Sequence, residues 1–343
     1  MTTNFFALGL GVGTQNSNGE WLDIFYPKPL LSPAPELAAC IADIELGQSN
    51  NTPLSSQQRS QLHTALVACG NGEQAEIAQQ FCNSDAPIIA VLLRTDEAPT
   101  TVPEAYLKLH LLSHRLVKPN GTDLTGLFGI LPNVAWTNEG AVDLAELPQR
   151  QLAARMKGEV LEVSCVDKFP KMTNYVVPEG VRIAHTARVR LGAYLGKGTT
   201  VMHEGFVNFN AGTIGPGMIE GRISAGVVVG SGSDLGGGAS IIGTLSGGGK
   251  IVISVGEECL IGANAGIGFP LGDRCTVEAG LYVTAGTKVS MIASDGKTVE
   301  RVKARELAGK SDLLFRRNSG SGAVECLTNR SAVELNAELH AHN

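Results

Sequence analysis

The sequence has few aromatic residues and no excess of positive charge. Only 17 of its 343 residues are Phe, Tyr or Trp, and 27 Lys and Arg stand against 33 Asp and Glu, a formal net charge of -6. A nucleic-acid or anionic-membrane binder needs a concentrated basic surface, so this balance argues against both partners. The chain is long enough to bury a large core, which excludes disulfide-scaffold, collagen-like and fully disordered proteins.

The sequence also lacks paired cysteine motifs and a charged leader. Its seven cysteines form no Cys-x-x-Cys or Cys-x-x-His pair. We therefore expect reduced, mostly buried thiols in a cytoplasmic protein, not a zinc or redox centre. The first basic residue is Lys28, so the apolar start lacks the flank of a secretory signal. Residues 223–249 carry a single charge, Asp234, but are too rich in Gly and Ser for a membrane span.

Glycine, in contrast, is abundant and concentrated, with 26 of the 42 glycines between Gly180 and Val289. In the same region a branched aliphatic residue recurs at every sixth position, a period that neither a strand nor a helix explains. A coil with three flat faces explains it, with the aliphatics inside and glycine at the corners. The repeat positions are Val177, Ile183, Val189, Leu195, Val201, Val207, Ile223, Val229, Leu235, Ile241, Val255, Ile261, Ile267, Leu271, Val277, Val283 and Val289.

We expect three parts along the chain, because the composition changes near residue 175 and the repeat ends near 290. Residues 1–174 form an N-terminal α/β domain, residues 175–290 the solenoid, and residues 291–343 a small C-terminal segment. In the last part, Ser331 and Glu334 predict a short helix. The repeat alone does not set the hand of the coil.

The N-terminal part contains two predicted helices. Thr101 and Glu104 have the spacing of a capping box and predict a helix over 102–117. Its apolar stripe consists of Leu107, Leu111, Leu112 and Leu116. A second helix is expected over 142–157. The glycines of 9–13 lack the last glycine of a dinucleotide fingerprint and no βαβ unit is evident, so we assign them no cofactor.

A solenoid is a scaffold, so function must come from residues that break its pattern. Polar and aromatic residues interrupt the repeat at 202–213, and the six-residue register slips at 218–222. A third unusual stretch, Leu314 to Ser319, lies outside the solenoid.

These motifs resemble the tetrahydrodipicolinate N-succinyltransferase family, in its longer form typical of pseudomonads and actinobacteria. The resemblance runs from about Val163 to Cys326, and residues 105–115 look like the pseudomonad branch. It rests on residues 166–172, the Glu204 motif, residues 243–249 and Phe315 to Ser319. The resemblance implies a left-handed parallel β-helix and a homotrimer. It also implies transfer of succinyl from succinyl-CoA to the amino group of ring-opened tetrahydrodipicolinate, a step of bacterial diaminopimelate and lysine synthesis.

The resemblance assigns a catalytic role to Glu220 and links Gly243 to activity. A carboxylate at Glu220 could attack the thioester or deprotonate the amine, and both roles stay open beside that of an ordinary turn residue. Arg222 matches a succinyl-CoA contact and could hold the succinyl carboxylate in a bidentate geometry, which would select against acetyl. The other succinyl-CoA positions implied are Gly237, Ser240, Ala263, Glu278, Ala279, Gly286, Lys303, Arg316, Arg317, Asn318 and Ser319.

Glu204 matches a magnesium ligand on the family's threefold axis, where three carboxylates would need a cation between them. Actinobacterial relatives carry an aspartate where this sequence has Ala187, which counts against the metal. His185 and His203 are 18 residues apart and should stack, like two ligands of a hexapeptide-repeat carbonic anhydrase. A catalytic zinc needs a third ligand, and the solenoid offers no third histidine.

Two other functions compete with succinyl transfer. An acetyltransferase on the same scaffold would act on an amino sugar or another amine with acetyl-CoA, and would not need Arg222. A non-catalytic solenoid would only organise partners, and would lose nothing when Glu220 is replaced. For the dicarboxylate acceptor, the residues with suitable chemistry are Asn208, Asn210 and Arg188.

Overall fold

The computed structural model describes residues 5–42, 44, 50–243, 251–293 and 295–328. The chain divides into two compact units, one formed by Met1–Val117 and Gly121–Pro170, the other by Lys118–Asn120 and Lys171–Asn343. In the described part of the chain, no helix is long and apolar enough to cross a membrane.

The N-terminal unit is built around an antiparallel sheet whose central strand is β1 (Ala7–Gln15). Strand β4 (Ile88–Leu93) pairs with one edge of β1, and β2 (Trp21–Phe25) and β3 (Leu30–Leu31) pair with the other. The glycines of 9–13 therefore lie in an antiparallel strand and not in a βαβ turn. Helices α1 (Pro35–Ala42), α2 (Ser56–Ala68) and α3 (Gly72–Cys82) complete the unit's apolar core.

Helix α4 (Val102–Ser113) begins where the capping signal predicts, because Thr101 Oγ1 accepts a hydrogen bond from the Glu104 N–H. The Glu104 carboxylate turns instead to the N–H and hydroxyl of Thr100. Leu107, Leu111 and Leu112 are buried, as the apolar stripe predicts. The predicted end at 117 is wrong: the helix stops at Ser113, and Leu116 is exposed.

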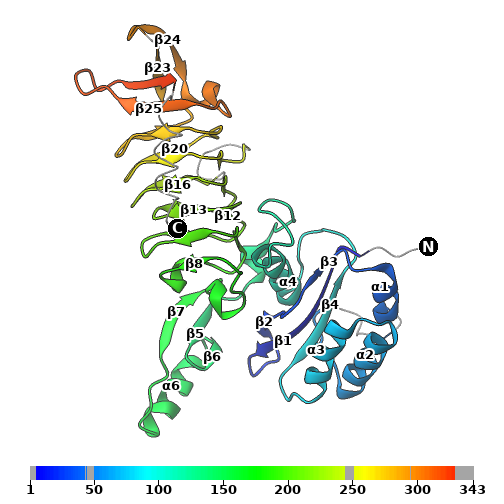
Figure 1. Ribbon diagram of the computed structural model, residues 1–343. Coiled ribbons are helices and arrows are strands. Elements are labelled where there is room, and N and C mark those ends of the chain that lie inside the picture. Colours follow the sequence, from blue (N-terminus) through cyan, green and yellow to red (C-terminus); the bar gives the residue numbers. More distant parts are fainter. Residues whose placement is uncertain (1–4, 43, 45–49, 244–250, 294, 329–343) are drawn as a thin grey trace. The chain divides into compact units, whose positions relative to one another are not determined.

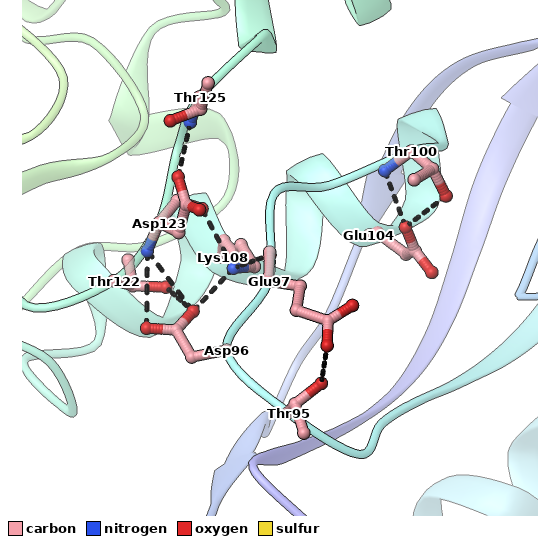
Figure 2. A network of polar contacts seen from close by, with 9 residues as sticks. All are labelled: Thr95, Asp96, Glu97, Thr100, Glu104, Lys108, Thr122, Asp123 and Thr125. Atoms are coloured by element: carbon pink, nitrogen blue, oxygen red, sulfur yellow. Dashed lines mark hydrogen bonds and ion pairs between the residues drawn. The ribbon is translucent and has the colours of Figure 1, made fainter.

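A lysine is fully buried on α4 and joins two loops. Lys108 Nζ lies 2.6 Å from Asp96 Oδ1 and donates to the carbonyls of Glu97 and Asp123 at 2.6 and 2.8 Å. Asp96 also accepts from the Thr122 hydroxyl at 2.7 Å and from the Asp123 N–H. Figure 2 shows these groups converging on the ammonium. The buried charge is thus satisfied by one carboxylate and two carbonyls, as such a charge requires.

The second part of this unit is a three-stranded antiparallel sheet of order β6-β5-β7. Its elements are β5 (Val134–Thr137), β6 (Gly140–Asp143), β7 (Val163–Asp167), α5 (Leu127–Ile130) and α6 (Leu147–Met156). The helix predicted over 142–157 therefore starts too early. Residues Gly140–Asp143 form a strand because the turn at 138–139 folds them back onto β5.

The second unit is the solenoid, in which short parallel strands stack as a column (Figure 1). The first face carries β8 (Arg182–Ile183), β10 (Thr199–Val201), β13 (Gly217–Ile219), β16 (Asp234–Leu235), β19 (Leu260–Ile261) and β21 (Thr276–Val277). The second carries β11 (Phe206–Val207), β14 (Arg222–Ile223), β17 (Ser240–Ile241), β20 (Gly266–Gly268) and β22 (Tyr282–Thr284). The third carries β9 (Ala193–Leu195), β12 (Ala211–Thr213), β15 (Val228–Val229) and β18 (Ser254–Val255). This is the predicted left-handed β-helix.

The repeat residues from Val189 onward are buried, which confirms the inward aliphatic column. The two earlier repeat residues are not buried: Ile183 is half-buried, and Val177, which lies before the first strand of the solenoid, is 71% exposed. The six-residue spacing of the inward aliphatics slips at two corners of the solenoid. Five residues usually separate successive inward aliphatics, but fewer lie between Ile219 and Ile223 and between Ile267 and Leu271. One glycine is indispensable: Gly212 has φ +154°, and a Cβ there would lie 1.8 Å from the Tyr194 carbonyl oxygen.

The column ends in two antiparallel pairs near the C-terminus. They are β23 (Lys288–Ile292) with β24 (Thr298–Lys303), and β25 (Leu313–Arg317) with β26 (Val324–Thr328). Strand β25 pairs in parallel with β21, so the last pair continues the first face of the solenoid. The described residues also form 3-10 turns at η1 (Met172–Asn174), η2 (Thr186–Arg188) and η3 (Ala304–Leu307). The predicted C-terminal helix at 331–334 lies outside the described residues.

Candidate functional site

The corner between the first and second faces of the solenoid brings part of the predicted site together. Backbone hydrogen bonds stack its residues coil on coil: Glu220 donates to Leu235, Gly236 to Ile261, and Gly262 to Val277. The next coil continues the column, where the Glu278 N–H donates to the Phe315 carbonyl. The predicted residues on this corner are Glu220, Gly237, Ala263, Glu278 and Ala279.

Glu220 occupies a gap in this corner. Five residues separate the inward aliphatics at the corners before and after it, but only Glu220, Gly221 and Arg222 lie between Ile219 and Ile223. This corner is therefore two residues shorter than its neighbours and forms a recess between them. A Cβ on Gly221 would lie 2.6 Å from the Ala239 carbonyl oxygen, so the short turn needs glycine. The recess leaves the half-buried Glu220 between two longer corners.

Gly237 leaves space on the next coil beside the carboxylate. A Cβ there would lie 3.5 Å from Glu220 Oε2, with no other heavy atom within 4 Å. The absence of a side chain gives a ligand access to Glu220, which suits a long acyl carrier running along the corner.

Arg222 is exposed at the start of β14, two residues after Glu220. The sheet register places it between Phe206 of β11 and Ser240 of β17. Ser240 and Arg222 are thus neighbours in the sheet at the same corner.

The hairpin β25–β26 holds the charged residues at the far end of the corner. Glu278 Oε2 accepts from the Arg317 backbone N–H at 2.6 Å, which ties this hairpin to the column. The buried Glu325 carboxylate accepts from Asn318 Nδ2 at 2.8 Å and from Arg316 Nε at 3.0 Å. These two contacts, Asn318 first, lower the pKa of Glu325. Ser319 follows in the exposed hairpin turn.

Gly286 and Lys303 lie near each other at the same end of the solenoid. The turn containing Gly286 accepts backbone hydrogen bonds from Ala304 and Arg305 through the carbonyls of Thr287 and Ala285. Lys303 immediately precedes that segment, and its backbone N–H donates a hydrogen bond to Glu306 Oε1 at 3.1 Å. Both residues are open to solvent.

Gly243 lies apart from Glu220, at the other end of β17. A Cβ on Gly243 would meet the Ala225 carbonyl oxygen at 2.9 Å and Ser224 Cβ at 3.2 Å. The structure thus explains a need for glycine there by close packing on the preceding coil. Residues 244–250, which complete the glycine-rich motif, are outside the described residues.

The Glu204 carboxylate is engaged by side chains of its own chain. Its Oε2 lies 2.7 Å from Arg188 Nη2 and its Oε1 lies 2.9 Å from His203 Nδ1. The hydrogen bond from His203 and the charge of Arg188 lower the pKa of Glu204. His203 also meets the His185 ring edge to face, 5.3 Å between centroids. Within the described ranges, no three His, Cys, Asp or Glu residues form a metal-binding group.

Some contacts near the site are not predicted from sequence. Asn210 exchanges hydrogen bonds with Asn120, which also donates to the Gly226 carbonyl at 3.0 Å. Arg190 Nη1 donates to Asn208 Oδ1 at 3.1 Å. The contact between Arg190 and Asn208 could have been predicted from their spacing of 18 residues, because that spacing equals one coil. Nothing in the sequence indicated the roles of Asn120 or Glu325.

Comparison with known proteins gives matches along the whole chain. Residues 131–171 match the family profile "Tetrahydrodipicolinate N-succinyltransferase middle", and residues 252–285 match "Hexapeptide repeat of succinyl-transferase". A 2,3,4,5-tetrahydropyridine-2,6-dicarboxylate N-succinyltransferase of Pseudomonas paraeruginosa is 65% identical, with 100% of both chains covered. The Vibrio cholerae enzyme of the same name is 60% identical, with 99% of each chain covered.

A solved structure shares the fold. It is a crystal structure from Campylobacter jejuni described as a 2,3,4,5-tetrahydropyridine-2-carboxylate N-succinyltransferase, with a TM-score of 0.88 and 33% identity. The match covers 96% of this chain and 93% of that one. With relatives this similar over their full length, the chain belongs to the tetrahydrodipicolinate N-succinyltransferase family.

Proposed function

We propose that this chain catalyses the reaction for which its family is named. Succinyl passes from succinyl-CoA to the amino group of ring-opened tetrahydrodipicolinate, giving N-succinyl-2-amino-6-oxopimelate and CoA in the diaminopimelate and lysine pathway. The observation that carries the proposal is the shortened corner at Glu220, where a carboxylate lies between Gly237 and Arg222 on a column of small residues.

The donor lies along this corner with its thioester at Glu220. The hairpin of Arg316, Arg317, Asn318 and Ser319, together with Lys303 and Gly286, holds the phosphates and adenosine end. Ala279, Glu278, Ala263, Gly237 and Ser240 line the pantetheine arm, where small side chains and backbone polar groups allow close approach. Arg222 binds the succinyl carboxylate through a bidentate pair that acetyl-CoA cannot form, which favours succinyl transfer over acetyl transfer.

Glu220 acts in one of two ways on this geometry. As a base, it takes the proton of the attacking amine while the C–N bond forms and the C–S bond breaks, releasing the CoA thiolate. As a nucleophile, its carboxylate first attacks the thioester carbonyl, so that the C–S bond breaks, the CoA thiolate leaves and a mixed anhydride forms; the amine then attacks the succinyl carbonyl of the anhydride, and the released Glu220 carboxylate takes the amine's proton. Gly243 supports the site through packing, since it lies at a different corner.

Rapid mixing with succinyl-CoA alone, followed by acid quench and peptide mass analysis, tests the assignment. A succinyl group on the peptide containing Glu220 identifies the nucleophile. The absence of both adduct and CoA release until the acceptor is added identifies the base. Acyl transfer to a different residue would overturn the role of Glu220.

The solenoid, residues 175–290, carries the transfer and the segment 291–343 contributes to CoA binding, while residues 1–174 form a separate α/β domain. We propose a homotrimer in the bacterial cytoplasm, the compartment that supplies CoA thioesters and keeps cysteine thiols reduced. A magnesium ion at Glu204 does not fit the residues of this chain. Both carboxylate oxygens already contact side chains, and the Arg188 guanidinium would repel a second cation. No step here uses a metal.

A further inference from the structure

A column of outward-facing residues runs along the second face of the solenoid. The sheet register stacks Arg222, Ser240, Gly266 and Tyr282 on successive coils. Each of them is followed by a fully buried aliphatic residue, so all four lie on the outer surface by strand alternation. The proposed succinyl contact, Arg222, and the proposed pantetheine position, Ser240, therefore share this column with two residues to which the motifs assign no role.

The aromatic ring of Tyr282 lies across the backbone of Gly266, on the neighbouring coil. A Cβ on Gly266 would lie 2.1 Å from Tyr282 Cε2 and 2.4 Å from its Cδ2 and Cζ. Because Cζ is the ring atom farthest from the tyrosine backbone, the ring covers the next coil and does not extend straight into solvent. Gly266 is accordingly buried although it belongs to the outer surface, whereas Tyr282 is 45% exposed.

The glycine at position 266 serves this ring and not the turn of the chain. Gly266 begins strand β20 and is not among the residues with positive φ, so its backbone conformation is open to other residues. The three heavy atoms closest to a Cβ at this position all belong to the Tyr282 ring. A methyl group on Gly266 would therefore displace the ring and leave the coil in place.

Three proposed donor positions lie close to Tyr282 in the chain or in the sheet. Ala279 belongs to the corner that leads into β22, and Gly286 belongs to the turn that follows this strand. Ser240 pairs with Gly266 on the side of that coil away from Tyr282. The ring thus lies between Ser240, assigned to the pantetheine arm, and Gly286, assigned to the nucleotide end.

We propose that Tyr282 binds the pantetheine arm of the acyl-CoA donor, with its ring against the apolar part of the arm and its hydroxyl on an amide. The arm alternates methyl and methylene groups with amides. A phenol suits both, because its ring is apolar and its hydroxyl can donate or accept a hydrogen bond. Since the ring already rests on Gly266, binding costs little side-chain freedom. This inference rests on the proposed function and adds a binding residue to it.

Titration calorimetry with two ligands tests the proposal. The ligands are CoA and adenosine 3′,5′-bisphosphate, which has the nucleotide end of CoA but no pantetheine arm. The variants are Tyr282→Phe, Tyr282→Ala, Gly266→Ala and the double variant of Tyr282→Ala with Gly266→Ala. Tyr194→Ala is the matched control, because Tyr194 is an outward tyrosine beside Gly212 on the third face of the same solenoid. Thermal unfolding and light scattering of each variant report its folding and its assembly.

We expect Tyr282→Ala to raise the Kd for CoA about tenfold to a hundredfold, the range for losing a buried aromatic contact, and to leave the Kd for adenosine bisphosphate within about twofold. Tyr282→Phe should raise the Kd for CoA about threefold, because it loses only the hydroxyl. Gly266→Ala should raise it at least about threefold by displacing the ring. In the Tyr282→Ala background the same methyl group meets no ring, so its effect should be less than about twofold. Tyr194→Ala should match wild type.

An unchanged Kd for CoA in Tyr282→Ala, or equal weakening of CoA and adenosine bisphosphate, would overturn the assignment. Dissociation of the assembly by Tyr282→Ala would also overturn it, because Tyr282 would then be a subunit contact. If Tyr282→Ala does not fold, Tyr282→Phe and Gly266→Ala decide the question by the same comparison of the two ligands. Failure of the proposed function is a distinct result: wild type would bind CoA but release no thiol from succinyl-CoA when the acceptor is added.

Discussion

Lys108 has the most demanding environment of the single residues described, because its ammonium is fully buried and depends on Asp96 and two carbonyls. Lys108→Met keeps the apolar stem but removes the charge, and leaves these acceptors without their donor. We expect the free energy of unfolding of the N-terminal unit to fall by about 3 kcal/mol. Urea unfolding followed by tryptophan fluorescence measures this, since both tryptophans, Trp21 and Trp136, lie in that unit.

Arg150→Met is the control for this prediction. Arg150 Nη2 lies 2.7 Å from Glu139 Oε2, but both side chains are largely exposed. Its replacement should cost less than about 1 kcal/mol. Equal effects of the two substitutions would contradict the importance assigned to the buried network.

The buried environment of His110 predicts how the stability of the same unit changes with pH. Its Nδ1 contacts the Tyr106 carbonyl and its Nε2 accepts from the Tyr26 N–H, and burial lowers its pKa to about 3. His114, stacked on it, also has a lowered pKa because of burial. The unfolded chain binds protons at these residues below about pH 6.5, whereas the folded unit binds them only at lower pH. Their contribution to stability is therefore complete above that pH and is lost as the pH falls.

The expected result is a fall in the free energy of unfolding between pH 7 and pH 5, with a slope of up to about 1.4 kcal/mol per pH unit from His110. Urea unfolding of wild type and His110→Gln at pH 7, 6 and 5 measures it. The variant should be less stable at pH 7 but should respond less to acid. Parallel curves for the two proteins would show that His110 is not the responding group.

At the scale of elements, substitutions at two adjacent glycines in one corner of the solenoid should have different effects, one on catalytic rate and the other on stability. Gly237→Ala places a methyl group 3.5 Å from Glu220 Oε2 and near no backbone atom, so the coil should fold normally. The methyl group would occupy the space through which we propose that the thioester approaches, and kcat/KM for succinyl-CoA should then fall about tenfold or more. Steady-state kinetics and thermal unfolding of the variant measure the two effects.

Gly236→Ala gives the opposite pattern. A Cβ there would lie 2.7 Å from the Ala263 backbone nitrogen, so the coil must shift and the unfolding temperature should fall. If Gly237→Ala lowers the unfolding temperature as much as Gly236→Ala does, the space beside Glu220 has a packing role and not an access role.

The sequence predicts well those elements whose hydrophobic pattern repeats many times along the chain. The inward aliphatics recur in every coil, so the solenoid, its faces and even the slip before Ile223 are readable. The strand at Gly140–Asp143 is not, because four residues of mixed character show no alternation and depend on pairing with β5. The end of α4 at Ser113 is also unreadable, since Leu116 continues the apolar spacing although the chain has already turned away.

The candidate site follows the same logic. Glu220 and Arg222 stand out because they break the repeat, and the charged hairpin stands out by its motif. Glu325 and Asn120 do not stand out, because their roles arise from hydrogen bonds between residues distant in sequence or of ordinary type. The contact of Glu204 with Arg188, on which our proposal of a metal-free site rests, also arises from side-chain pairing that the sequence does not reveal.

For the whole molecule, the proposed trimer should be independent of metal. Each Glu204 has its own arginine, so chelation should change neither the assembly nor its activity. Light scattering should give three times the chain mass of 35.9 kDa with and without EDTA, and CoA release should be equal in both conditions. Dissociation by EDTA that magnesium reverses would contradict this prediction.

The most direct test of the account is the rate of CoA release by Glu220→Gln, which keeps the size of the side chain but removes its charge and basicity. Thiol release from succinyl-CoA is followed with and without acceptor, beside wild type and the exposed control Glu257→Gln. We predict acceptor-dependent release by wild type and the control, and a rate about a thousandfold lower in Glu220→Gln with an unchanged unfolding temperature. A rate in Glu220→Gln within about tenfold of wild type, the range of a minor positioning effect, would contradict the central role of Glu220.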